Sequence, residues 1–304
     1  MKPAADGMEG REGKRAAAAG CAAGLAAFAL FYFLPVKNST AAPAPEPAEL
    51  KPATVEAFEQ YVRLTTARND EELRRGSPFL LVDSLPEPQR QQAYAALRAG
   101  EVRIERLETL HDGHPMDCPD GLIHHWVGVI FIPGATLEQT LRLVEDYDHH
   151  ATYYAPDVQR AKILARQGDD FTVVMRFRRK KVVTVVLDTV HQIHYGRLDA
   201  TRAFSRSATT RVAEVENPGQ PDEHEKPAGH DGGYLWGMNT WWRFVERDGG
   251  TYVQSESVSL TRNIPAVVKW LVGPFVTSIP REALTFTLTA TRNALRNRAS
   301  VAAH

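Results

Sequence analysis

The order of the predicted elements from Gly121 to Arg298 constrains the fold of this chain more than any other feature. The sequence predicts one strand, one short helix, a run of long alternating strands and a closing helix. About half of the closing helix or more is apolar at roughly 100° per residue, through Ala283, Leu284, Phe286, Leu288, Ala290, Ala294 and Leu295. A helix with so wide an apolar face must be covered widely. We therefore expect an α+β helix-grip fold, in which a curved antiparallel sheet wraps around the long C-terminal helix and leaves a hollow; a core helix in a solid domain is the alternative.

The strand patterns locate the parts of this sheet. Residues 122–133 are dense in β-branched and aromatic residues, and Thr136 with Gln139 forms a capping box that starts a helix soon after. Short breaks between the later strands imply an antiparallel meander. Residues 217–233 are rich in Gly, Pro and charge, so we expect a disordered loop there. The meander strands are predicted at 157–166, 170–179, 182–195, 203–215, 234–246 and 251–262.

An apolar segment near the amino terminus predicts export or anchoring. Residues 16–34 carry no charge and follow Arg11, Lys14 and Arg15. Roughly 19 apolar residues approach the ~20 that span a bilayer, so a retained anchor is favoured, whereas Ser39-Thr40-Ala41 offers a cleavage pattern for a signal peptide. The preceding positive charge places the amino terminus in the cytoplasm and the domain outside it, in the periplasm of a Gram-negative bacterium, with secretion after signal cleavage as the alternative.

The segment after the anchor joins it to the main domain. Two helical stretches, 54–68 and 88–99, have too few apolar residues for a core of their own and should pack on the outside of the main domain. Val102 and Ile104 alternate with charges and predict an edge strand. The chain then divides into 1–15 (cytoplasmic amino terminus), 16–36 (transmembrane anchor or uncleaved signal), 37–53 (Pro/Ala-rich linker), 54–120 (helical preface) and 121–298 (main domain).

Composition narrows the classes of partner. The chain has 304 residues, 43% of them hydrophobic, and a formal net charge of −1, which argues against nucleic acid. Its two cysteines, Cys21 and Cys118, are not expected to meet. The histidines from His111 to His125 fit no standard zinc spacing, so no metal is expected. The sequence also shows no glycine-rich phosphate loop and no GxSxG elbow, and we predict no cofactor and assign no catalytic residue.

Three segments in this order resemble the START-like superfamily, which also contains polyketide cyclase-like and coenzyme Q-binding proteins. They are FIPGATLEQTLRLVEDYDHHATYYAPDV at 131–158, YLWGMNTWWRFVE at 234–246 and GGTYVQSESVSLTRNIP at 249–265. The resemblance covers roughly residues 120 to 298 and lies in order and pattern, since no short motif identifies chemistry. It implies a START-like ligand-binding domain over 121–298 that carries a lipid or another hydrophobic molecule, or, less often, a cyclase or hydrolase.

Strand periodicity predicts which side chains line the hollow, if the more apolar face of each strand is the inner one. The polar members of that face are the informative ones, because a buried charge needs a partner. Arg206 and Glu256 either pair with each other and fix the strand register, contact a ligand, or lie on the other face of the sheet than the one assigned. His191 is a hydrogen-bonded strand histidine or a general base. The candidate ligand-binding residues are His191, Arg206, Trp236, Met238, Trp242, Tyr252, Gln254, Glu256, Leu284 and Leu288.

These residues predict a membrane-tethered domain that binds a lipid-like or aromatic small molecule in an internal cavity without altering it, as a carrier or sensor at the cell envelope. Two alternatives stay open. A cyclase or dehydratase would use the same cavity, with His191 or Glu256 as acid or base. A domain whose core is filled by its own side chains would instead bind another envelope protein.

Overall fold

A computed structural model describes residues 48–180, 184–263 and 266–302, with side chains of the last helix from Ser278 to Arg298. The apolar segment 16–36, in which we predicted a membrane anchor, lies outside the described residues. Among the residues that are described, no helix is both long and apolar enough to cross a bilayer.

The centre of the molecule is one large antiparallel sheet in the order β2-β5-β13-β12-β9-β8-β7-β6, with β10 paired to β9. The meander strands β6 to β9, β12 and β13 lie where alternation and turn residues predicted them, and β2 is the edge strand expected around Ile104. The first strand, β5, pairs with β13 at the end of the meander, so β5 and β13 form the centre of the helix-covered part of the sheet. The strands are β2 Arg103–Arg106, β5 Gly121–Pro133, β6 Val158–Gln167, β7 Asp170–Lys180, β8 Thr184–Arg197, β9 Arg202–Glu216, β10 His224–Glu225, β12 Gly237–Arg247 and β13 Gly250–Arg262.

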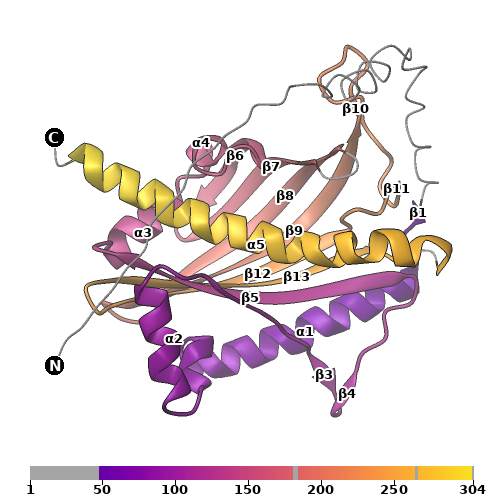
Figure 1. The fold of residues 1–304 in the computed structure, drawn as a ribbon. Helices are drawn as coiled ribbons and strands as arrows, with labels where there is room; N and C mark the ends of the chain where they lie inside the picture. Colours follow the sequence, from indigo (N-terminus) through magenta and orange to yellow (C-terminus); the bar gives the residue numbers. More distant parts are fainter. Residues whose placement is uncertain (1–47, 181–183, 264–265, 303–304) are drawn as a thin grey trace, which may run out of the picture. The chain divides into compact units, whose positions relative to one another are not determined.

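Helices lie on both faces of this sheet (Figure 1). The long helix α5 (Ala266–Ala302) crosses one face, and α3 (Leu137–Val144) packs beside it. The preface helices α1 (Pro52–Arg75) and α2 (Gln89–Arg98) lie on the opposite face, joined by the 3-10 turn η1 (Leu81–Ser84). The turn η2 (Tyr147–His149) and the short α4 (His150–Tyr153) connect α3 to β6.

The core on the α5 side, called the α5 face below, has the geometry of a helix held by a sheet. Val253 and Phe244 pack there with Leu284, Leu288 and Leu295 of α5. Gly128 of β5 allows the closest approach, because a Cβ atom at this position would lie 2.5 Å from Leu288 Cδ1 and 2.6 Å from Ile104 Cδ1. Helix α5 therefore lies closest to the sheet at Gly128.

The core on the other side, called the α1 face below, joins the preface to the sheet in two clusters. Phe58 and Tyr61 of α1 pack on Trp241, Val258 and Leu260. Around α2, the second cluster contains Phe79, Leu80, Val82, Ala93, Leu97, Val129, Phe131, Val245 and Tyr252. Both faces of β5, β12 and β13 are therefore buried, so neither face can be read as solvent-exposed.

Segment 217–233 is more ordered than its composition predicted. It contains β10 and β11 (His230–Asp231), and β11 pairs with the two-residue β1 (Ala48–Glu49). Asp231 is buried and accepts hydrogen bonds from the backbone N–H of Gly233 at 2.7 Å and from Trp236 Nε1 at 3.1 Å. These contacts order a segment that has few apolar residues, because backbone pairing and a buried carboxylate replace apolar burial.

The histidine-rich stretch before β5 forms an exposed hairpin of β3 (Leu110–His111) and β4 (His114–Pro115). His111 and His114 are exposed, whereas His124 and His125 are buried on opposite faces of β5. Within the described part of the chain, no three His, Cys, Asp or Glu side chains are grouped closely enough to hold a metal ion.

Candidate functional site

The α5 face carries a patch without charge where the strands extend past the packed end of α5. Alternation along β13 places Ser255, Ser257 and Ser259 on this face, on the side of Val253, which packs with α5. The register of β12 and β9 places Met238, Thr240 and Trp242, then Ser205 and Ser207, on the same face. We call this group the neutral patch: Trp126, His191, Ser205, Ser207, Met238, Thr240, Trp242, Ser255, Ser257 and Ser259.

Two serines of the neutral patch, Ser255 and Ser259, are buried residues on the face toward α5. Ser255 is 1% exposed and Ser259 is 7% exposed, yet neither hydroxyl makes a hydrogen bond within the part of the chain that the structure describes. Thr251, on the same face nearer the packed end, donates to Ala135 O at 2.7 Å. Because buried hydroxyls normally find a partner, the serines are available to polar atoms of a bound molecule.

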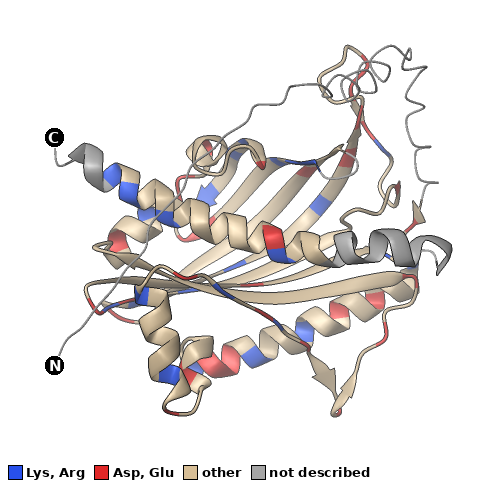
Figure 2. Cartoon of the chain, viewed as in Figure 1, with Lys and Arg blue, Asp and Glu red and all other residues tan. Residues whose placement is uncertain are grey.

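No acidic or basic side chain lies among the α5-face positions of the central strands. This holds for the described positions 251–259 of β13, 238–244 of β12, 203–209 of β9 and 189–195 of β8. Figure 2 shows charged residues along α1, at the carboxyl end of α5, in the middle of α5 and at positions on several strands. On these four strands a ligand would meet hydroxyls, aromatic rings and the imidazole of His191. Beside β5, the same face also carries His124, opposite Ser259, and Arg106 of β2, opposite Trp126.

His191 is the titratable member of the neutral patch, and it is held neutral. Burial lowers its pKa to about 4. Thr189 Oγ1 donates to Met175 O at 3.1 Å, so its oxygen accepts from His191 Nε2–H at 2.8 Å. Nδ1 is then the acceptor, and it faces Ser207 Oγ at 3.4 Å. The imidazole is thus oriented by a threonine and not by a carboxylate, unlike the base of a hydrolytic triad.

Trp242 and Met238, two other candidates, lie on the α5 face as predicted and are half-buried. Leu284 and Leu288 are buried in the core under α5. Trp236 was predicted to line the same hollow, but it packs on the α1-side cluster with Phe58 and Tyr61. It precedes β12, so strand alternation does not apply to it.

The structure corrects the placement of four other candidates. Arg206, Tyr252, Gln254 and Glu256 all lie on the α1 face. We had assumed that the more apolar face of each strand lines the hollow. In β13 the more apolar face is instead the α1 face, which α1 and α2 bury. The face toward α5 carries the serines. Arg206 and Glu256 do not pair: Arg206 forms an ion pair with Asp70, and Glu256 with Arg68.

Glu256 is the centre of a buried polar network between α1 and the sheet. Tyr61 accepts from the backbone N–H of Thr109 at 2.7 Å and donates to His125 Nδ1 at 2.9 Å, and His125 Nε2 donates to Glu256 at 2.8 Å. Burial opposes ionisation of Glu256, but the hydrogen bond from His125 and the charge of Arg68 outweigh it and lower the pKa of the carboxyl. This network holds α1 on the sheet. The partners of Glu256 are therefore protein side chains on the α1 face.

Other polar residues on the α1 face also bind the preface. Arg243, 3% exposed, donates to Phe79 O at 2.8 Å and to Asn69 Oδ1 at 2.6 Å. Gln254 accepts from the backbone N–H of Leu81 at 2.6 Å. The sequence of the preface could have indicated these contacts. Its polar residues Thr65, Asn69 and Glu72 repeat at helical spacing and share one side of α1.

Two surface hollows lie on the α1 side of the sheet. The first, about 590 Å³, is bordered by residues such as Thr66, Arg206 and Trp241. The second, about 470 Å³, lies between α2 and the β12–β13 turn. The hollow beside α5 stays a prediction, because the side chains of residues 264–277 lie outside the described part of the chain.

The order strand, helix, antiparallel meander and long closing helix, with α5 laid across the sheet, is the arrangement expected from the sequence. The chain has an α+β fold with a large antiparallel sheet and a long closing helix, consistent with a helix grip. No protein-family model and no curated protein sequence matches it.

Solved structures of START-type proteins are similar to this chain in fold. The STAR-related lipid transfer protein of Xanthomonas axonopodis (fragment 25–204) is 16% identical, with a TM-score of 0.42, over 64% of this chain and 98% of that one. Human STARD10 is 10% identical, with a TM-score of 0.40, over 68% and 80%. The Zhui aromatase/cyclase from Streptomyces sp. R1128 is 10% identical, with a TM-score of 0.39, over 59% and 96%.

Proposed function

We propose that this START-like domain binds an uncharged, lipid-like or aromatic small molecule between the neutral patch and α5, as a carrier or sensor. The observation that carries the proposal is the pairing of half-buried Trp242 and Met238 with serine hydroxyls that have no partner among the described residues. Apolar enclosure would supply the affinity, at roughly 25 cal/mol per Å² removed from water before ordering costs. The hydroxyls and His191 would orient the polar atoms of the ligand.

The absence of charge at the described α5-face positions of β8, β9, β12 and β13 favours a neutral ligand over a fatty acid or a charged headgroup. An ionised group buried there would lose its hydration without gaining a countercharge, which costs several kcal/mol. Hydroxyl, keto and ester groups carry no such cost, because serine and threonine hydroxyls both donate and accept hydrogen bonds.

An enzymatic use of the same site is the second candidate, because Ser207 faces His191 Nδ1. A neutral imidazole beside a hydroxyl can accept a proton at pH 7, as a cyclisation or dehydration would require. The lack of a carboxylate on Nε2 favours binding over catalysis, since nothing described stabilises the imidazolium that would form.

The test is native mass spectrometry of the full chain, purified in mild detergent, followed by extraction into organic solvent. Binding predicts an uncharged apolar molecule that co-purifies near one per chain. Failure to find one, together with no uptake of an added neutral amphiphile, would contradict the proposal. A pH–rate profile that depends on His191 would instead favour the enzyme.

The same proposal places the domain outside the cytoplasm, tethered by residues 16–36. The supporting feature is the uncharged segment behind Arg11, Lys14 and Arg15. Amino-terminal sequencing of the mature chain distinguishes an anchor from a cleaved signal, since cleavage after the small residues near Ala41 would yield a new amino terminus.

A further inference from the structure

The second hollow, between α2 and the β12–β13 turn, is unusually rich in arginine. Arg90, Arg98, Arg202 and Arg247 line it, against two acids, Asp83 and Asp248. Each arginine has a carboxylate partner, Glu87 for Arg90, Asp248 for Arg98, Asp199 for Arg202 and Asp83 for Arg247. The site is therefore distinguished by its number of guanidinium N–H donors and not by an excess of positive charge. We infer that this groove binds a phosphate group, carried either by a soluble phosphomonoester or by a lipid headgroup.

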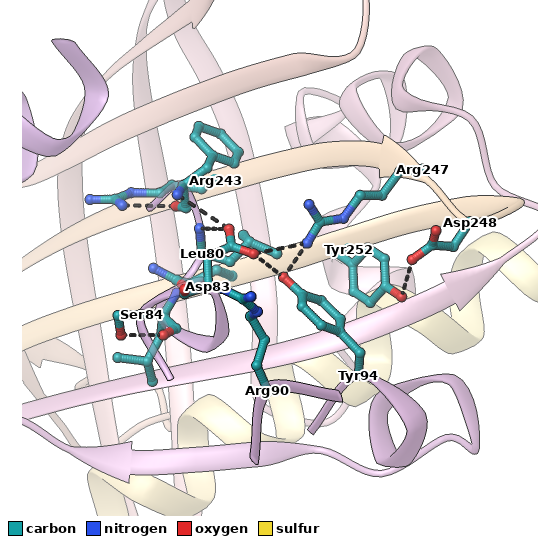
Figure 3. A network of polar contacts seen from close by, with 12 residues as sticks. Leu80, Asp83, Ser84, Arg90, Tyr94, Arg243, Arg247, Asp248 and Tyr252 are labelled. Atoms are coloured by element: carbon teal, nitrogen blue, oxygen red, sulfur yellow. Dashed lines mark hydrogen bonds and ion pairs between the residues drawn. The ribbon is translucent and has the colours of Figure 1, made fainter. Parts of the chain in front are cut away.

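Asp83 is an ionised carboxylate whose two oxygens both accept hydrogen bonds from protein groups. Oδ2 accepts from the backbone N–H of Leu80 at 2.8 Å and of Phe79 at 3.2 Å, and Oδ1 accepts from Tyr94 and, at 3.1 Å, from Arg247 (Figure 3). Burial opposes its ionisation, but these hydrogen bonds outweigh burial and lower the pKa of Asp83. Asp83 therefore positions Arg247 and Tyr94 and remains ionised.

The guanidinium of Arg247 lies over the rings of Tyr94 and Tyr252. Its Cζ lies 4.7 Å from the ring centroid of Tyr94 and 5.3 Å from that of Tyr252. Two aromatic faces restrict the side chain, which is the arrangement that pre-organises an arginine for anion binding. Figure 3 shows Arg247, Tyr94 and Arg90 together at this end of the sheet.

Three arginines retain N–H donors that have no partner within the described part of the chain. Arg247 uses only Nη2, Arg98 uses Nη1, and Arg202 uses Nε and Nη1. Side-chain exposure is 38%, 44% and 33% respectively, so a dissolved anion can reach them. They come from β12, α2 and β9, three separate elements around one hollow.

The number of donors favours phosphate over a carboxylate. A phosphomonoester presents three terminal oxygens and a charge near −2, whereas a carboxylate presents two oxygens in one plane and a single charge. Three guanidinium groups on separate elements match the phosphate, and each fork can make paired hydrogen bonds to its oxygens. The groove lies on the face of the sheet opposite to the neutral patch, so this site is independent of the proposed ligand site.

The experiment compares two double variants of the full chain that change the charge equally. Arg98→Gln/Arg202→Gln removes two groove arginines, and Arg74→Gln/Arg75→Gln removes two that pair with Glu71 on exposed α1. Inorganic phosphate binding is measured by calorimetry at constant ionic strength with acetate as the control anion. Vesicles of phosphatidylcholine, with and without phosphatidic acid, test the headgroup source.

We expect the groove variant to lose about tenfold or more in phosphate affinity, as charge-assisted hydrogen bonds predict, and the α1 variant to keep it. Asp248→Asn should tighten binding by removing a negative charge from the groove. Binding of inorganic phosphate alone identifies a soluble ligand, and a phosphatidic acid-dependent gain identifies a headgroup. No binding of either probe, equal losses in both double variants, or equal affinity for acetate would overturn the inference. Circular dichroism melting checks that the variants fold.

Discussion

Trp241 and Trp242 are adjacent in β12 but lie on opposite faces of the sheet. Trp241 opposes Glu256 of β13 and packs under α1 with Phe58 and Tyr61. Trp242 opposes Ser255 and stacks on Phe244, with ring centroids 6.0 Å apart, on the side of α5. Strand β12 therefore places one tryptophan in the contact with α1 and the next in the proposed ligand site.

This pair gives a matched test of where a ligand binds. We expect a neutral apolar ligand to change the fluorescence of Trp242 and to leave that of Trp241 unchanged, because only Trp242 borders the neutral patch. Titrations of Trp242→Phe and Trp241→Phe measure this. The ligand-dependent change should be reduced in the first variant and kept in the second, and the reverse pattern would place the ligand on the α1 face.

Glu256→Gln should reduce stability without a direct effect on the ligand site. The substitution leaves Arg68 without its buried countercharge and changes the hydrogen bond from His125, and breaking such a pair costs about 3–5 kcal/mol in buried cases. Arg68 is partly exposed, so we expect about 2–3 kcal/mol from urea unfolding. Glu71→Gln, whose partners Arg74 and Arg75 are exposed, is the control and should cost under about 1 kcal/mol. Unchanged stability in Glu256→Gln would show that the network does not hold α1.

Stability should fall with acidification before the carboxylates titrate. Burial lowers the pKa of His124, His150 and His191 from 6.5 to about 4. The unfolded chain therefore binds protons that the folded chain does not between about pH 6.5 and pH 4, and stability is lost as the pH falls through that window, by at most about 1.4 kcal/mol per pH unit for each histidine. Urea unfolding at pH 7.5, 6.5 and 5.5 measures the slope. His191→Gln should flatten it, and an identical slope would mean that His191 is protonated in the folded chain.

Gly128→Ala should weaken the docking of α5 on β5. The added Cβ would lie 2.5 Å from Leu288 Cδ1 and 2.6 Å from Ile104 Cδ1, and overpacking of this kind costs about 1–3 kcal/mol. In a Leu288→Ala background the same change should cost less, since one of the two clashing groups is gone. A double-mutant cycle by thermal unfolding measures the coupling. Purely additive effects would mean that α5 does not pack over Gly128.

The sequence predicted the strand order well because turns and alternation are local properties. Asp248-Gly249-Gly250 ends β12 and begins β13 at the predicted place, and the capping box at Thr136 starts α3. The inward faces of β7 and β8, with Phe171, Val173 and His191, were also predicted correctly, since their other face carries charge.

The faces of β13 and β9 could not be predicted from the strands alone. In β13 the apolar side chains share the face of Glu256, and the other face carries the serines. Only the packing of α1 and α2 shows that the more apolar face is a joint with the preface, and this contact joins residues far apart in the sequence. The partners of Glu256 were missed for the same reason, although Arg68 lies one turn from Thr65 and Glu72 on α1.

The most direct test of ligand binding on the α5 face is to fill the neutral patch and measure uptake of a neutral dye. Ser257→Trp adds a ring on that face, and Asn239→Trp adds the same ring on the opposite face, because Asn239 lies one position out of phase with Thr240, which opposes Ser257. Nile red fluorescence is titrated with both full-chain variants. We predict saturable binding by the wild-type chain and by Asn239→Trp, and its loss in a folded Ser257→Trp. Undiminished binding by Ser257→Trp would contradict the account.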